Sequence, residues 1–425
     1  MAAWLLVIFL FLLLSGLPIG FAMATTALII IYMYDIVSIT SVSNMMYSAL
    51  NTYTLVALPF FILVGSFLSG GRVVGYIYDF ANSFLGKIKG GLGVAVIITS
   101  GVLAAISGSS MANAAALSMV LLPVLVKHSY PRGNAAALIA TGGTLGILIP
   151  PSITMIVFGV VTNQSIGKLF ISGVIPGIIL MIFLMIAAVI LAPKGTKSTE
   201  NFSLMRCWAT FKKAFAIILA PVIILGGIYL GWFTPEEAAA VATIYCIIIA
   251  GFWYKTLTIK QIFTIFRDGS YTSARIMFLV SAAMIFAYVV TLSQIPQLMI
   301  ETIGNSGVSL FWVVVMVNLV LIVLGCFLDV FSIMLITLPV VYPILTKLGY
   351  DPFQMAVMYT INMEIGTITP PVGMNLYAIA GTSDVPIDEI VRHSWPYYIV
   401  LLIGLALVSS IPWLSNWLPS LMSMD

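Results

Sequence analysis

The chain has 425 residues, of which 61% are hydrophobic and 7% are charged. This composition excludes a soluble globular protein and predicts an all-α polytopic membrane protein. The net charge of +3 does not indicate a nucleic-acid partner, because in a membrane protein the placement of the charges carries the information.

The residues that carry metal or redox chemistry in other proteins are few and scattered. Cys207, Cys246 and Cys326 share no metal-binding or redox spacing, and His128 and His393 fall in connecting segments. We therefore expect no site built from cysteine and histidine and no organic cofactor. No nucleophile, base and orienting group occur together, so we do not expect an enzyme.

The chain begins with apolar segments. The stretch from Trp4 to Tyr34 is interrupted at 15–18 and predicts two short helices or one bent helix. Its first apolar run, Trp4 to Leu14, lacks a basic flank and a small-residue cleavage site, so we expect it to be retained rather than removed as a signal peptide. Residues 35–51 are of mixed polarity and suit the membrane interface. The next predicted span is 54–68.

A pair of short apolar arms follows, 90–106 and 111–127, joined by the small polar residues 107–110. An arm of 17 residues reaches about 25 Å, which is less than the roughly 30 Å of the hydrocarbon core. The pair predicts a re-entrant hairpin. The alternative is two ordinary helices with a tight external turn.

The next apolar segment contains Gly146 and the pair Pro150–Pro151. Proline removes a backbone donor and disfavours helix at the preceding residue, so carbonyls near Gly146 and Ile149 lose their helical partners. Broken backbone at membrane depth is tolerated where it lines a cavity, and transporters hold cations with such carbonyls. A simple proline kink is the alternative interpretation.

The same break recurs as Gly366 followed by Pro370–Pro371, and 370 − 150 = 220. At this offset, without gaps, Pro123 also aligns with Pro343, and Lys127 with Lys347. A kink would not bring its flanking residues with it, so the sequence predicts an internal duplication. Paired interrupted segments in two halves indicate a transporter's binding site.

The duplication predicts two repeats joined by a linker. The first covers 1–192, with scaffold helices in 1–86, a hairpin 90–127, a broken helix 134–163 and a helix 171–191. A basic cytoplasmic linker covers 193–213. The second covers 214–425, with scaffold helices in 214–292, a hairpin 308–347, a broken helix 353–383 and a helix 395–418.

The charges sort by side when the linker is placed in the cytoplasm. Fifteen of the 17 lysine and arginine residues then face inward: Arg72, Lys87, Lys89, Lys127, Arg132, Lys194, Lys197, Arg206, Lys212, Lys213, Lys255, Lys260, Arg267, Arg275 and Arg392. Only Lys168 and Lys347 face outward. Positively charged loops stay in the cytoplasm, so both termini are expected outside and the two repeats are inverted.

Each half brings a hairpin tip to its broken segment. Freed carbonyls suit a small cation such as Na⁺, and helix N-termini at the tips suit an anion. The first tip offers neutral hydrogen-bonding groups for a polar substrate, namely Ser107, Ser109, Ser110 and Asn113.

Asp329 at the second tip and Glu364 before the second break are the acids placed inside the membrane. Asp329 is expected to contact substrate or to respond to a nearby cation. Glu364 fits a structural partner or a functional group equally well, and proton coupling is a third possibility for either.

Several stretches together resemble one protein family: 58–65 (LPFFILVG), 107–113 (SGSSMAN), 149–152 (IPPS), 165–170 (SIGKLF), 233–239 (FTPEEAA) and 367–375 (TITPPVGMN). This series is similar to the large membrane subunit of TRAP transporters, the tripartite ATP-independent periplasmic carriers, over essentially the whole chain. The resemblance implies an importer of small organic acid anions in the bacterial inner membrane. It also implies Na⁺ coupling, an elevator motion, and two partners, a smaller membrane subunit and a secreted periplasmic binding protein.

The resemblance further implies two Na⁺ sites. One falls on Ala105, Gly146, Ile149 and Ser152, and the other on Gly325, Gly366, Thr369 and Val372. Members that carry sialic acid tend to have aspartate where this chain has Asn113, so the substrate stays open among a C4-dicarboxylate, a small sulfonate, a sugar acid and a sialic acid. The alternative functions are a self-sufficient Na⁺- or H⁺-coupled organic anion symporter of the same fold and a purely structural membrane subunit.

Overall fold

A computed structural model describes residues 1–69, 71–85, 88–194, 196 and 202–422, and this part of the chain is helical without strands. The first half contains α1 (Ala2–Leu14), α2 (Ile19–Met33), α3 (Ile39–Leu50), η1 (Tyr53–Val56), α4 (Ala57–Leu68), α5 (Gly71–Leu85), α6 (Gly91–Ser107), α7 (Ser110–Lys127), α8 (Arg132–Gly143), η2 (Thr144–Ile147), α9 (Ile153–Thr162), α10 (Ile166–Ser172) and α11 (Val174–Ile190). The second half contains α12 (Leu204–Tyr229), α13 (Pro235–Ile248), η3 (Ile249–Trp253), α14 (Ile259–Leu292), α15 (Ile295–Ser306), α16 (Leu310–Gly325), α17 (Val330–Lys347), α18 (Pro352–Thr367), α19 (Met374–Ser383), α20 (Ile387–Ser410) and α21 (Trp413–Ser420).

The duplication extends to the ends of the helices. Helix α17 begins and ends 220 residues after α7, since 330 − 110 = 220 and 347 − 127 = 220. Helix α18 begins 220 residues after α8, since 352 − 132 = 220. The hairpin α6–α7 and the broken helix α8–α9 therefore have counterparts in α16–α17 and α18–α19. This confirms the fold expected from the sequence.

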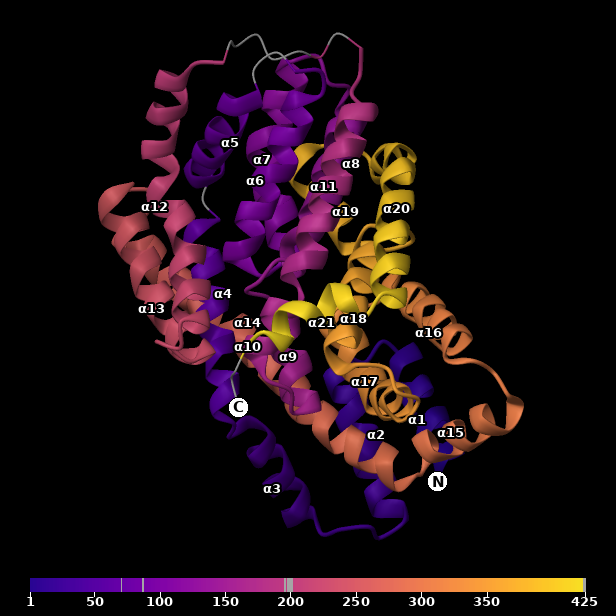
Figure 1. The fold of residues 1–425 in the computed structure, drawn as a ribbon. Helices are drawn as coiled ribbons and strands as arrows, with labels where there is room; N and C mark the ends of the chain where they lie inside the picture. The colour runs from indigo at the N-terminus through magenta and orange to yellow at the C-terminus, as the bar shows by residue number, and fades with distance from the viewer. Residues whose placement is uncertain (70, 86–87, 195, 197–201, 423–425) are drawn as a thin grey trace.

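The two repeats are inverted and interlock. In Figure 1 the open end of the α6–α7 hairpin lies at the top, on the same side as the start of α12, whereas α15, which leads into α16–α17, lies in the lower part near the N-terminus. Helix α7 packs against α19, and α17 packs reciprocally against α9. The repeats are also tied by side chains at two places. Glu389 accepts a hydrogen bond from the Gly133 backbone at 3.0 Å, and Gln164 donates to Tyr342 at 3.0 Å.

The remaining helices form the scaffold. Helix α4 packs between α13 and α14, while α2 and α3 also lie against α14. Thr234, followed by Pro235 and two glutamates, predicts a helix start, and this is confirmed because Thr234 and Glu237 form a reciprocal capping box at the start of α13. Among the residues that the structure describes, seven helices are long and apolar enough to cross a membrane, or eight if α3 and the segment 53–68, bent by 59°, form one span. Part of the predicted linker, residues 195 and 197–201, lies outside the described residues, as do Lys87, Lys197 and Asp425.

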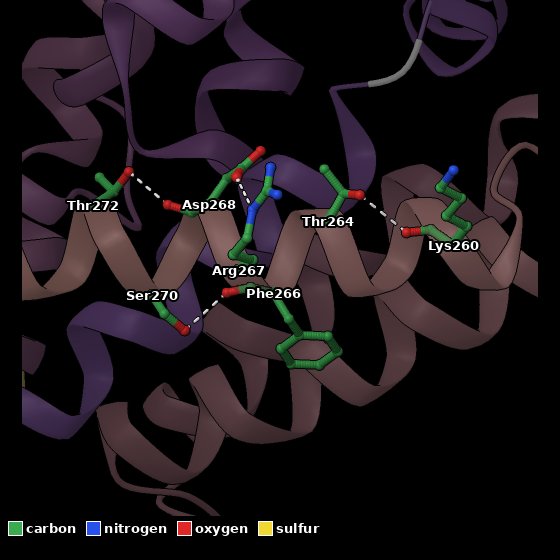
Figure 2. A network of polar contacts seen from close by, with 7 residues as sticks. All are labelled: Lys260, Thr264, Phe266, Arg267, Asp268, Ser270 and Thr272. Atoms are coloured by element: carbon green, nitrogen blue, oxygen red, sulfur yellow. Dashed lines mark hydrogen bonds and ion pairs between the residues drawn. The ribbon is translucent and has the colours of Figure 1, made fainter.

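Helix α14 is longer than the sequence predicted. Within the scaffold segment 214–292, the charges of Lys255, Lys260 and Arg267 predict a basic connection before a span at 271–292, but the helix begins at Ile259 and has 34 residues. Its length of about 51 Å exceeds the roughly 30 Å of the hydrocarbon core, so its charged first turns extend beyond the core. Figure 2 shows Arg267 paired with Asp268 at 3.0 Å and the hydroxyl groups of neighbouring residues bonded to carbonyls one turn back. A hydropathy pattern identifies only the apolar part of this helix. Lysine and arginine are compatible with a helix but not with the lipid interior, so the charged part reads as a connection. Helix α15, at 295–306, was likewise not expected.

The inverted arrangement predicts the sidedness of two equivalent positions. Lys127 and Lys347 are exposed at the last residues of α7 and α17. Cysteines introduced at these positions (K127C and K347C) should react with a membrane-impermeant maleimide from opposite sides of oriented vesicles. Cys207, Cys246 and Cys326 are buried, so the background labelling should be low. Labelling of both positions from one side would contradict the inverted topology.

Candidate functional site

The two breaks are local consequences of the proline pairs. In an α-helix the carbonyl of residue i accepts from the N–H of residue i+4. Pro150 and Pro151 have no N–H, so the carbonyls of residues 146 and 147 lose their i+4 donors, and Pro370 and Pro371 do the same to residues 366 and 367. The Gly366 carbonyl accepts instead from the Thr369 N–H at 3.0 Å and keeps its second lone pair. The chain accordingly leaves the helix in both places. Helix α8 passes into the 3-10 turn 144–147 before α9 begins at 153, and α18 ends at 367 before α19 begins at 374. Both proline–proline bonds are cis.

The first hairpin tip lies directly on the first break. A Cβ atom added to Gly146 would stand 2.7 Å from the Cα atom of Ser110 and 2.9 Å from the carbonyl oxygen of Ser109. A Cβ atom added to Gly108 would lie 3.1 Å from the carbonyl oxygen of Pro151. Ser152 is fully buried and caps α9, accepting from the Met155 backbone at 3.4 Å. Glycine is required here because the backbones approach too closely for a side chain.

The second tip meets the second break in the same way. A Cβ atom added to Gly366 would lie 2.6 Å from the Cα atom of Gly325. The backbone N–H of Val372 donates to the carbonyl of Cys326 at 3.0 Å, which links the segment after the break to the tip. The Thr369 hydroxyl donates to the Ile365 carbonyl at 2.5 Å, and its lone pairs are then available to a cation. Residues 325, 366 and 372 of the second predicted Na⁺ site thus lie together.

The neutral residues of the first tip do not all face the same way. The Ser107 hydroxyl donates to the Ser109 carbonyl at 3.4 Å and accepts from the Ser109 N–H at 3.5 Å. The Ser109 hydroxyl caps α7. Asn113 is 2% exposed and points back into the hairpin, where its amide donates to Ser100 at 3.2 Å. Its other amide atom, Oδ1, is buried without a partner among the described residues. In this conformation Asn113 therefore joins the two arms of the hairpin.

Asp329 has a local role that the sequence analysis did not assign to it. It is the N-cap of α17, where Oδ1 accepts from the backbone of Phe331 and Ser332 at 3.1 Å and Oδ2 accepts from the Ser332 hydroxyl. Ser109 occupies the equivalent place in the first repeat, since 329 − 220 = 109. The second tip thus has a negative charge where the first has a neutral cap.

Glu364 is buried in α18, before the second break. It is 1% exposed and neighbours Ser110 of the first tip and Thr367, and the Asn375 amide donates in turn to Thr367 at 3.1 Å. Thr367 and Asn375 belong to the motif 367–375, but the sequence alone did not place them near Glu364. Tyr398 was also missed. Its hydroxyl donates to the carbonyl of Ile368 and ties α20 to the break.

The first tip also touches the scaffold. A Cβ atom added to Gly65 of α4 would stand 2.8 Å from the carbonyl oxygen of Ser107. Gly65 ends the motif 58–65, so this motif places a scaffold helix against the tip without a side chain between them.

Comparisons with known proteins agree with this architecture. Residues 6–414 match the family described as the tripartite ATP-independent periplasmic transporter, DctM component. The chain is 39% identical over 389 residues to the C4-dicarboxylate TRAP transporter large permease protein DctM of Pseudomonas aeruginosa, covering 91% of each chain. It is 33% identical to the sialic acid TRAP transporter large permease protein SiaM of Vibrio cholerae, covering 96% of each. The crystal structure of the Alcanivorax borkumensis YdaH transporter superposes with a TM-score of 0.61 at 15% identity, covering 89% of this chain and 88% of that one. This last likeness is one of fold.

The contact between Gly366 and Gly325 can be tested by adding one methyl group. Gly366→Ala should separate the second hairpin from its break, and overpacking of this kind costs about 1–3 kcal/mol. The melting temperature of the purified protein should fall. Gly381→Ala is the matched control, because a Cβ atom there meets nothing within 4 Å. Equal melting temperatures for the two variants would contradict the close approach.

Proposed function

The chain belongs to the family of the DctM component, the large permease of tripartite ATP-independent periplasmic transporters, and from this premise we propose that it imports a small organic acid anion with Na⁺. The observation that carries the proposal is the pairing of a hairpin tip with a broken helix in each repeat. Each pairing places freed carbonyls beside the start of a helix, and these are the groups that hold a cation and an anion.

Two Na⁺ sites are proposed at these junctions. The first uses Ala105, Gly146, Ile149 and Ser152, and the second uses Gly325, Gly366, Thr369 and Val372. Carbonyl and hydroxyl oxygens are hard donors that suit a small cation. In support, Gly146 and Gly366 are the positions whose carbonyls lose a helical donor to the proline pairs.

The anion site is proposed between the tips. Ser107, Ser109 and Ser110 provide hydrogen bonds from the first tip, with Asn113 behind them, and Asp329 lies at the second tip. The N-termini of α7 and α17 add partial positive charge. The relatives are named for C4-dicarboxylate and sialic acid transport. A C4-dicarboxylate is the first substrate to test, because the permease with 39% identity is named for it.

Transport is proposed to follow an elevator mechanism in the bacterial inner membrane, with both termini in the periplasm. The hairpins and broken helices would move together against the scaffold, as the glycine contact between α4 and the first tip allows. The proposed partners are a small membrane subunit and a periplasmic substrate-binding protein. The second candidate is a self-sufficient organic anion symporter, which would share the fold but need neither partner.

Reconstitution tests the function and separates these candidates. The permease, its small subunit and its binding protein should together take up radiolabelled succinate into proteoliposomes when an inward Na⁺ gradient is applied. Omission of the binding protein should abolish uptake, because the anion is delivered by that protein. Uptake by the permease alone would favour the self-sufficient symporter. Equal uptake of succinate with and without Na⁺ would contradict Na⁺ coupling.

Asp329 is proposed to contribute its charge to transport in addition to capping α17. Asparagine caps helices about as well as aspartate, so Asp329→Asn should preserve the fold. A charge-assisted hydrogen bond contributes about 1.5–3 kcal/mol, so the variant should lose uptake by roughly tenfold or more. Asp351→Asn is the control, because Asp351 caps α18 in the same way, accepting from Phe353 and Gln354 at 2.8 and 3.1 Å. Wild-type uptake by Asp329→Asn would leave Asp329 as a helix cap only.

A further inference from the structure

A buried polar cluster joins the two repeats beside the second break. We name the group Ser110, Glu364, Thr367 and Asn375 the Glu364 cluster. Its members are at most 5% exposed. Ser110 lies 3.4 Å from Asn375 Oδ1, the Asn375 amide donates to Thr367 at 3.1 Å, and Thr367 Oγ1 lies 3.3 Å from Glu364 Oε2. Ser110 comes from the first hairpin, and the other three come from the second broken helix.

Few hydrogen atoms are available to the carboxylate. A hydroxyl group has one hydrogen to donate. The Thr367 hydroxyl lies closer to the Glu364 backbone carbonyl, at 2.8 Å, than to the carboxylate, and the Ser110 hydroxyl neighbours both the carboxylate and Asn375 Oδ1. Oε1 of Glu364 is buried without a hydrogen-bond partner, and Glu364 forms no ion pair within the residues that the structure describes. A buried carboxylate in this state is costly unless it takes up a proton or a positive ion lies beside it.

The other repeat shows that the fold does not need these polar groups. At the offset of 220, the positions equivalent to Ser110, Glu364, Thr367 and Asn375 are Val330, Thr144, Ile147 and Met155. Three of these four are apolar. The fourth, Thr144, bonds to the carbonyl of Thr141 at 2.6 Å, inside its own helical turn. A carboxylate retained on one side only of a duplicated fold points to a function rather than to packing.

We propose that the Glu364 cluster binds a further Na⁺ ion, distinct from the two at the hairpin junctions. The donors would be the Glu364 carboxylate, the hydroxyls of Ser110 and Thr367, and the amide oxygen of Asn375, all of which are hard oxygen ligands. One carboxylate balances one unit of positive charge, which favours a monovalent ion over Ca²⁺ or Mg²⁺. The inference rests on the proposed Na⁺ coupling and adds to its stoichiometry.

An ion at this place would connect two parts that belong to different repeats. It would bind the start of α7 to the two sides of the second break, α18 and α19. Ser110 is also the residue against which Gly146 packs at the first break. The occupied cluster would therefore fix the first tip relative to both breaks. Binding of the ion would in this way affect the geometry of both hairpin junctions.

The test counts Na⁺ ions with the complete transporter. The reversal potential of succinate flux in proteoliposomes gives the number of Na⁺ ions per substrate. Glu364→Gln keeps the size and removes the charge, so it should transport one fewer Na⁺ ion per succinate than the wild type. Asp351→Asn, an acid-to-amide change on the same helix, should keep the wild-type ratio. An unchanged ratio in Glu364→Gln would overturn the proposal. If the unchanged Na⁺ ratio came with a loss of H⁺ movement, the cluster would be assigned to a proton instead.

Binding of ²²Na⁺ to the purified complex without substrate gives a second measurement if Glu364→Gln does not transport or fold. Ser110→Ala removes one donor but leaves the carboxylate. It should shift the ²²Na⁺ binding curve of one class of sites to at least about threefold higher concentration. A binding curve identical to that of the wild type would overturn the proposal. If wild-type uptake itself shows no Na⁺ dependence, the proposed function fails, and this outcome is distinct from failure of the cluster alone.

Discussion

The structure depends on one constraint, that backbone groups inside a bilayer need hydrogen-bond partners within the protein. Two consecutive prolines in each repeat work against this constraint, because they remove the i+4 N–H donors for the carbonyls of residues 146, 147, 366 and 367. The hairpin tips pack over the breaks and shield the backbone there from lipid. Glycines at 146, 325 and 366 let backbone meet backbone, and the N–H of Val372 bonds across to the second tip. Polar backbone is thereby concentrated at two places in an otherwise apolar protein.

Duplication supplied two similar frames, and the side chains then diverged. The caps of α7 and α17 are the neutral Ser109 and the charged Asp329. Near the breaks, Thr144 bonds within its own turn, whereas its counterpart Glu364 reaches toward the first repeat. Negative charge thus accumulates in the second half. Because the repeats interlock through α7 with α19 and α9 with α17, this charge lies at the join between them rather than in one half alone.

The features that could be predicted from the sequence are those that repeat along the chain or that follow from proline. The offset of 220, the proline breaks and the hairpin arms follow from residue identities, and the helix ends show the same offset. The sequence did not predict the length of α14, because a charged continuation of a helix looks like a connection in hydropathy. It also did not foresee that Asn113 turns toward Ser100, or that Asn375 bonds to Thr367 beside Glu364. The first contact joins two helices and the second lies across the break, so their geometry depends on how the breaks and tips pack.

Charge placement also limits how such a protein can move. The described contacts between the first tip and α4 include a bare glycine, Gly65, that meets the backbone carbonyl of Ser107. A buried carboxylate opposes movement more strongly, because its charge must be compensated at every position that it passes through. A ligand shifts a conformational equilibrium only by its difference in affinity between the two states. In the proposed elevator motion, a cation that compensates a buried acid would therefore have a direct effect on which positions the moving part can occupy.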